Sequence, residues 1–109
     1  MASPAMNTPQ NSRVIVVLFT ISGCEACEEY KPRFQRIAQH YPQVPVVMLD
    51  ANDPRNADLG TRLNVNNVPA TFVLRRPSGV IRVESAIPDT QIVWLFNVAA
   101  REVALGPHY

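Results

Sequence analysis

The stretch VIVVLFTISGCEAC, residues 14–27, decides the fold. Its first part, residues 14–19, is apolar and rich in β-branched side chains, which is typical of a strand buried on both faces. Its last part holds Cys24 and Cys27, and a helical pattern follows them. A Cys-x-x-Cys pair between a strand and a helix indicates redox chemistry. The letters ISGC also resemble the end of a lipoprotein signal peptide, in which Cys24 would become the lipidated first residue.

The signal-peptide interpretation conflicts with the rest of the pattern. Its apolar core would be residues 14–21 alone, and Arg13 is the sole charged side chain before it. Cleavage before Cys24 would also remove the only strand that can precede the first helix. We therefore expect a cytoplasmic protein, where reducing conditions keep the two cysteines as thiols. No apolar run of the sequence reaches the roughly 18 residues that a membrane span requires.

Length and composition indicate one globular domain. The chain has 109 residues, of which 47% are hydrophobic and 17% charged. A net charge of +1 gives no electrostatic reason to expect nucleic acid or an anionic membrane as a partner. Residues 1–12 are polar and contain Pro4 and Pro9, so we expect a flexible N-terminal tail followed by a domain over residues 13–109.

The periodicity predicts an α/β fold with the element order β-α-β-α-β-β-α. The first two strands flank a helix, so they should be parallel with a right-handed crossover. The last two strands are separated by a short turn and should form an antiparallel hairpin. The result is a mixed four-stranded sheet with helices on both faces. The predicted strands are residues 14–19, 44–49, 71–74 and 80–84, and the predicted helices are residues 24–41, 55–63 and 89–105.

This combination resembles the thioredoxin superfamily. A buried strand leads into Cys24-Glu25-Ala26-Cys27, and Pro32 follows the second cysteine by five residues, where thioredoxins keep a proline inside the helix. Val68-Pro69 before the third strand resembles the family's cis-proline segment. The hairpin and the terminal helix complete a match over roughly residues 13–105. The resemblance implies a thioredoxin-like fold and a cis Val68–Pro69 peptide bond.

The resemblance also implies a function, that of a thiol–disulfide oxidoreductase acting on protein disulfides without a cofactor. Cys24 would be the nucleophile, because the free N–H groups at the helix start favour a thiolate, and Cys27 the buried resolving thiol. Gly23, Val68 and Pro69 would contact the substrate. A reductase would recycle the oxidised pair.

Three departures from the family pattern modify this expectation. Glu25-Ala26 replaces the usual Gly-Pro, Gly23 replaces a Trp, and Leu18 stands where thioredoxins bury an aspartate. The carboxylate of Glu25 disfavours a second negative charge on the neighbouring sulfur, which shifts the pair toward reductant character. Leu18 cannot accept the proton of Cys27, so we expect slower exchange than in a typical thioredoxin.

The cysteine pair is also compatible with other functions. The main alternative is a thioredoxin-fold binding or scaffold module with weak redox activity, and two inert buried thiols are a further possibility. We expect no metal, because Zn²⁺ takes about four ligands, and neither His40 nor His108 has metal-site spacing to the cysteine pair.

The terminal helix is apolar over more than one face. Val93, Trp94 and Val98 lie outside its main core stripe. They form either a wide stripe against the sheet edge or a surface around Trp94 for a partner or for self-association. We expect a monomer, with a weak dimer through this helix as the alternative.

Overall fold

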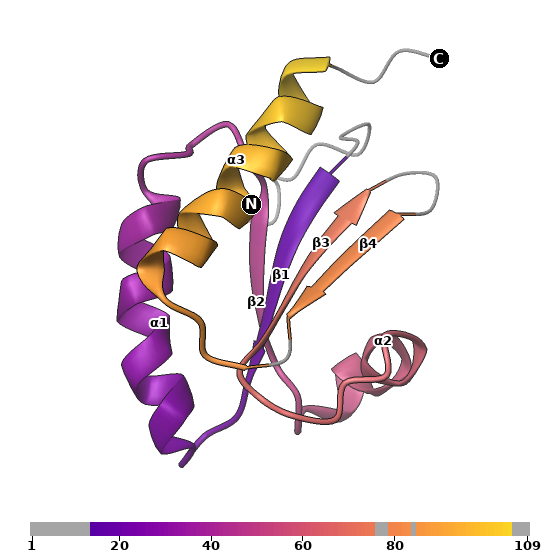
Figure 1. Ribbon diagram of the computed structural model, residues 1–109. Coiled ribbons are helices and arrows are strands. Elements are labelled where there is room, and N and C mark those ends of the chain that lie inside the picture. Colours follow the sequence, from indigo (N-terminus) through magenta and orange to yellow (C-terminus); the bar gives the residue numbers. More distant parts are fainter. Residues whose placement is uncertain (1–13, 76–78, 84, 106–109) are drawn as a thin grey trace, which may run out of the picture.

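The computed structural model describes residues 14–75, 79–83 and 85–105 (Figure 1). The described elements follow the predicted order, with one short 3₁₀ turn added between the second strand and the second helix. The predicted tail lies outside the described residues, as does most of the predicted turn between the last two strands. The elements are β1 (Val14–Thr20), α1 (Glu25–Ala38), β2 (Val46–Asp50), η2 (Pro54–Asn56), α2 (Ala57–Arg62), β3 (Ala70–Arg75), β4 (Gly79–Val83) and α3 (Asp89–Leu105).

The sheet has four strands in the order β2-β1-β3-β4, which confirms the mixed sheet. β1 pairs in parallel with β2 and antiparallel with β3, and β3 pairs antiparallel with β4. Because β1 lies in the interior of the sheet and is covered on both faces, six of its seven residues are buried. This explains why its sequence is almost entirely apolar.

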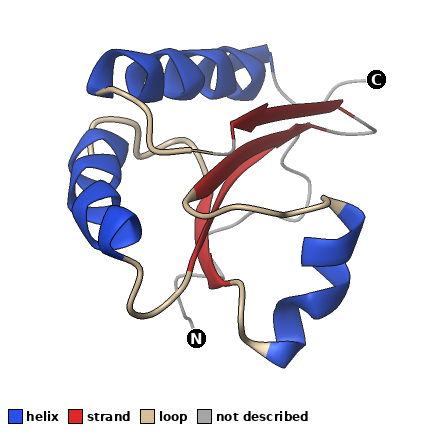
Figure 2. Ribbon diagram, turned by 60° about the horizontal axis from the view of Figure 1, so that its bottom comes forward, coloured by secondary structure: helices blue, strands red, loops and turns tan. Residues whose placement is uncertain are grey.

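Helices cover both faces of the sheet, as predicted. α1 and α3 lie together on one face and α2 lies on the other (Figures 1 and 2). Alternate residues of β1 divide between the two sides, since successive strand side chains point to opposite faces. Val16 and Leu18 join the core under α1 and α3, whereas Val17 and Phe19 join the core under α2.

Helix α1 is shorter at both ends than the predicted helix over residues 24–41. Cys24 is the N-cap and has extended backbone angles, so the first helical residue is Glu25. After Ala38 the chain tightens into turns that join residues three apart: the N–H of His40 donates to the carbonyl of Ile37, and that of Tyr41 to the carbonyl of Ala38. This tightening is common at helix ends and moves the boundary by three residues.

Strand β2 begins two residues later than predicted, at Val46. Val44 is buried, but its N–H donates to the carbonyl of Tyr41 within the turn that follows α1. Pro45 contributes only its carbonyl, which accepts a hydrogen bond from Val16. The predicted start at residue 44 is therefore wrong, because Val44 is an apolar residue of a buried turn and not the first residue of a strand.

The predicted helix over residues 55–63 is divided into η2 and α2. Asp53 caps η2 by accepting a hydrogen bond from the N–H of Arg55 at 2.9 Å. α2 ends with Asn64 in the left-handed region, at φ 56°. The N–H of Val65 donates to the carbonyl of Gly60 and that of Asn64 to the carbonyl of Thr61, which is a Schellman ending. This ending turns the chain toward Pro69 and β3.

Arg33 of α1 connects this helix to the start of α3. Its guanidinium donates to both carboxylate oxygens of Glu29, to the carbonyl of Ile87 and to the carboxylate of Asp89 at 2.7 Å. The pair that Glu29 and Arg33 form along the helix is therefore one part of a larger network. The network holds the middle of α1 against the segment that enters α3.

Candidate active site

The turn after β1 directs the chain into α1 through a single glycine. Gly23 has φ 78°, a left-handed conformation that side chains with a Cβ rarely adopt. A Cβ placed there would meet nothing within 4 Å, so the backbone angle and not crowding requires glycine. Gly23 is exposed, and the residue that follows it is Cys24.

Cys24 caps the helix with its sulfur. The Sγ atom accepts a hydrogen bond from the backbone N–H of Cys27 at 3.1 Å, in the role that a serine or aspartate oxygen usually has. The carbonyl of Cys24 accepts the first helical hydrogen bond, from Glu28 at 3.0 Å. The half-buried sulfur therefore lies among the free N–H groups of the first turn, where negative charge is favoured.

Cys27 lies one turn further on and is fully buried, with an exposed fraction of 0%. Burial raises the pKa of the Cys27 thiol; its hydrogen bond with Cys24 and the negative charges of Cys24 and Glu28 act in the same direction. A backbone hydrogen bond with Ile21 opposes the increase in pKa. Both cysteines are free thiols, so the structure shows a reduced pair with one accessible and one protected sulfur.

The peptide bond between Val68 and Pro69 is cis, as the resemblance implied. Pro69 is buried and Val68 is half-buried. In the antiparallel ladder Ala70 pairs with Phe19, so Pro69 lies one residue beyond the last pair, at the sheet end where β1 turns toward Cys24. Figure 1 shows both segments at this end of the sheet. Gly23, Cys24, Val68 and Pro69 therefore all belong to segments at the same end of the sheet.

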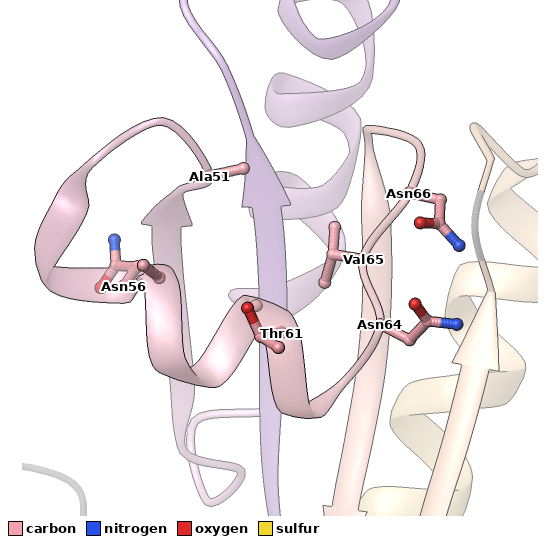
Figure 3. A pocket seen from close by; sticks show the side chains of 8 residues that line it. Ala51, Asn56, Thr61, Asn64, Val65 and Asn66 are labelled. Carbon is pink, nitrogen blue, oxygen red and sulfur yellow. The ribbon is translucent and has the colours of Figure 1, made fainter.

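Two hollows flank this end of the sheet. One of about 230 Å³ borders the turn before Cys24 and is lined by residues of β1, β2 and α1, among them Ser22, Glu28 and Asp50. The other, of about 410 Å³, lies on the α2 side (Figure 3). Its polar lining is uncharged, with amide side chains and one hydroxyl. The polar side chains there are Asn56, Thr61, Asn64 and Asn66.

Neither a metal site nor a membrane span is present over residues 14–75, 79–83 and 85–105. No three His, Cys, Asp or Glu side chains of this part of the chain are grouped to hold a metal ion. None of the described helices has the length and apolar character to cross a membrane.

Comparison with known proteins decides the family. The family model described as Thioredoxin matches residues 6–97. The chain belongs to the thioredoxin family. Its Cys24–Cys27 pair at the start of α1 is the feature on which thiol–disulfide exchange in this family depends.

Individual thioredoxin-family relatives are distant. A "Disulfide bond formation protein" of Brevibacillus choshinensis is 26% identical over 93 residues, which are 85% of this chain and 77% of that protein. A "Thioredoxin" of Mycoplasma genitalium is 25% identical over 83 residues, 76% of this chain and 79% of the relative. Among solved structures, Fasciola hepatica thioredoxin matches with a TM-score of 0.72 at 22% identity, over 83% of this chain and 85% of that one, and supports the fold.

Leu18, where the resemblance implies a buried aspartate, lies in the interior of the fold. Leu18 is fully buried in the core under α1 and α3, the side of the sheet that faces Cys27. Directly opposite it in the β1–β3 ladder is Thr71, which is also fully buried. The Thr71 hydroxyl oxygen lies 3.1 Å from the hydroxyl oxygen of Tyr30 on α1, within hydrogen-bond distance. A neutral hydroxyl pair therefore lies beside the position that the resemblance assigns to a carboxylate.

Sequence reasoning did not single out this pair. Tyr30 falls within the predicted helix over residues 24–41 and Thr71 begins the predicted strand over residues 71–74, and neither is among the predicted site residues. Burial raises the pKa of Tyr30, and its hydrogen bond to Thr71 offsets part of this increase. The phenol is therefore neutral at physiological pH. A buried hydroxyl without a partner costs about 1–3 kcal/mol, so the two groups depend on each other. The one signal in the sequence is a hydroxyl residue within the apolar run ATFVL.

Proposed function

We propose that the chain is a thiol–disulfide oxidoreductase that reduces protein disulfides in the cytoplasm, with Cys24 as the nucleophile and Cys27 as the resolving thiol. The observation that supports this most strongly is the contrast between the two sulfurs. Cys24 is half-buried and accepts a hydrogen bond at the N-cap of α1, whereas Cys27 is fully buried one turn away. Membership of the thioredoxin family supports the same chemistry.

The first step forms a mixed disulfide. The Cys24 thiolate attacks one sulfur of the substrate disulfide, a bond forms between them, and the substrate S–S bond breaks. The second substrate sulfur leaves as a thiolate and takes a proton from water. The N–H groups at the start of α1 favour the attacking thiolate. The hydrogen bond from Cys27 N–H to Cys24 Sγ is one such contact.

The second step releases the reduced substrate. Cys27 loses its proton and attacks the Cys24 sulfur, the Cys24–Cys27 disulfide forms, and the first substrate sulfur leaves as a thiolate that is then protonated. Two electrons have passed from the cysteine pair to the substrate. Because burial raises the pKa of Cys27 and Leu18 cannot accept a proton, this step should be the slower one. A reductase would return the pair to the dithiol.

The direction of exchange follows from the surroundings of the pair. Glu25 is exposed beside Cys24, and its carboxylate disfavours a thiolate there, which makes the dithiol the better electron donor. The names of the two relatives point to opposite directions of exchange: thioredoxin to the reduction of disulfides, and disulfide bond formation protein to their formation. We favour reduction, because Glu25 acts in this direction and a cytoplasmic pair rests as a dithiol.

Substrate contacts follow from the residues around Cys24. Gly23, Val68 and Pro69 would contact the polypeptide that carries the disulfide, as the family resemblance implies. Gly23 is exposed and leaves open space beside Cys24. The hollow of Figure 3 adjoins the segment that leads to Pro69, and its neutral amides suit the N–H and C=O groups of an extended peptide.

An insulin reduction assay with dithiothreitol as the final reductant tests the proposal. Wild type should accelerate reduction over the uncatalysed rate, and Cys24→Ser should abolish this acceleration. Ser22→Ala, a change of similar size two residues earlier in the same turn, should retain it. A Cys24→Ser variant with wild-type turnover would refute the proposal.

One observation favours a second candidate, a thioredoxin-fold binding module. Trp94 of α3 is 54% exposed, although Val93 beside it packs partly against the core. Val93 therefore fits the wide-stripe interpretation, whereas Trp94 is available for contact with a partner or a second copy. We propose a monomer with at most weak self-association there. Equilibrium sedimentation that shows a tight dimer in wild type but not in Trp94→Ala would contradict this.

A further inference from the structure

We propose that Tyr30 and Thr71 are positioning residues that hold the helix carrying Cys27 in register with the Val68–Pro69 segment. This inference rests on the proposed function. It assigns a role to two residues outside the cysteine motif and the cis-proline segment. Neither residue would touch the substrate, so both would act through the groups that they position.

The geometry connects the two halves of the site. Tyr30 is one helical turn after Cys27 on the buried side of α1, and Thr71 is two residues after Pro69 on β3. Their hydroxyl oxygens are 3.1 Å apart and both side chains have an exposed fraction of 0%. The contact therefore joins the segment that holds the resolving sulfur to the strand that begins next to Pro69.

The hydrogen bond between Tyr30 and Thr71 fixes one position of α1 against β3, whereas apolar packing alone would tolerate several positions. The surrounding core consists of apolar side chains such as Leu18 and Phe34, which attract without preferred direction. Movement of α1 along the sheet would leave both hydroxyls buried without a partner, because water does not reach them. The hydroxyl pair therefore selects a single register of α1 against β3, a role that buried polar groups perform in other packed interfaces.

Register matters most for a polypeptide substrate. Such a substrate would be held by Val68 and Pro69 while its sulfur aligns with Cys24, so the distance between the two segments sets the geometry of attack. A small disulfide without a polypeptide chain needs only access to Cys24. Loss of this register should consequently slow the reduction of protein disulfides and leave the reduction of small disulfides almost unaffected.

Three single variants test this on insulin and on hydroxyethyl disulfide. Tyr30→Phe keeps the ring that lies under the Arg33 guanidinium and removes the hydroxyl alone. Thr71→Val removes the partner, and Thr71→Ser retains a hydroxyl. We expect Tyr30→Phe and Thr71→Val each to lower kcat/KM for insulin about tenfold, with the rate on hydroxyethyl disulfide within twofold of wild type. Thr71→Ser should keep wild-type activity on both. Equal losses of activity on both substrates in Tyr30→Phe or Thr71→Val would overturn the proposal. A loss of activity in Thr71→Ser would also overturn it.

The double variant Tyr30→Phe/Thr71→Val separates register from stability. It leaves no unpaired hydroxyl, so its melting temperature should be at least that of either single variant. Its insulin activity should nevertheless stay near the single-variant level. Recovery of activity together with stability would mean that the pair is merely structural, and would overturn the inference.

A matched control exists at the other end of α1. The Tyr41 hydroxyl donates to the Asn97 side chain at 2.8 Å, far along the chain from the cysteines. Tyr41→Phe also removes one hydroxyl contact, here between the turn that follows α1 and helix α3, and it should keep wild-type activity on both disulfides. An insulin defect in Tyr41→Phe equal to that of Tyr30→Phe would overturn the inference. A wild-type protein inactive on insulin but active on hydroxyethyl disulfide would instead refute the proposed function.

Discussion

The backbone N–H of Cys27 donates a hydrogen bond to the sulfur of Cys24 over 3.1 Å. This contact makes one cysteine the cap of α1 and places the other inside the first turn. The two thiols therefore differ in exposure although only two residues separate them, and burial raises the pKa of Cys27. This difference and the residues around the two cysteines determine how stability depends on pH, the reduction potential of the pair and the rate of the second step.

The first prediction concerns the pH dependence of stability in the reduced protein. The pKa of Cys27 is raised from an ordinary value of 9.0, mainly by burial, so the folded state keeps this proton after the unfolded state has lost it. Its contribution to the free energy of unfolding is complete below pH 9.0 and is lost as pH rises through the folded-state value. Urea unfolding between pH 7 and 10 should show this decrease.

Cys27→Ala is the comparison for that experiment, because it removes the thiol and leaves Cys24 in place. Its free energy of unfolding should decrease less steeply than that of wild type just above pH 9.0. Tyr30, whose pKa is also raised by burial, contributes in the same direction above an ordinary value of 10.0 and is common to both proteins. Identical slopes in the two proteins would contradict the assignment to Cys27.

The second prediction concerns Glu25 and the reduction potential. Glu25→Gln removes the negative charge beside Cys24, so the thiolate becomes less unfavourable and the potential becomes less reducing. Glu25 is exposed and screened by solvent, so the change should stay below about 30 mV. Equilibration with glutathione measures it. Asp58→Asn makes the same charge change at an exposed residue of α2 and should leave the reduction potential unaltered. A reduction potential of Glu25→Gln that is more reducing than that of wild type would contradict this role of Glu25.

The third prediction concerns Leu18 and the rate of the second step. Leu18→Asp would place a proton acceptor on the side of β1 that faces Cys27, and an acid–base group contributes about 10²–10⁴-fold when it is well placed. Stopped-flow measurement of substrate release should show resolution at least tenfold faster than in Leu18→Asn, which has similar size and no charge. Both variants should lose several kcal/mol of stability, since Leu18 is fully buried. Equal release rates would contradict the explanation.

The fourth prediction compares two glycines. An added Cβ would meet nothing within 4 Å at either Gly23 or Gly60, but only Gly23 has a positive φ, of 78°. Gly23→Ala should therefore cost about 1–2 kcal/mol in free energy of unfolding. Gly60→Ala, inside α2, should stabilise by about 0.5–1 kcal/mol because alanine is the better helix former. Chemical denaturation measures both values, and destabilisation by the same amount at both sites would contradict the role of the backbone angle.

Much of the fold was predictable because its elements have local signatures. The apolar run of β1, the helical spacing of α1 and the hairpin of β3 and β4 are each visible within a short window of sequence. The position of Cys24 at a helix start follows from the same windows. The boundaries were less predictable: Val44 is apolar and buried, yet it belongs to a turn whose hydrogen bonds depend on the end of α1.

The parts of the site that sequence reasoning missed depend on distant contacts. Tyr30 and Thr71 are 41 positions apart, and each fits an ordinary core pattern on its own. Only the β1–β3 register, which sets Leu18 opposite Thr71, shows that hydroxyls lie beside the leucine. Trp94 differs from this pair: its place outside the core stripe of α3 already left an interaction surface open, and the side chain is 54% exposed.

Trapping of the mixed disulfide tests the central proposal most directly. Cys27→Ser removes the resolving thiol, so a disulfide-bonded substrate such as insulin should remain attached to the protein. We predict an adduct that dithiothreitol releases and that peptide mapping places at Cys24, with no adduct in the Cys24→Ser/Cys27→Ser control. Failure of Cys27→Ser to form any adduct, or formation of an equal amount in the control, would contradict exchange through Cys24.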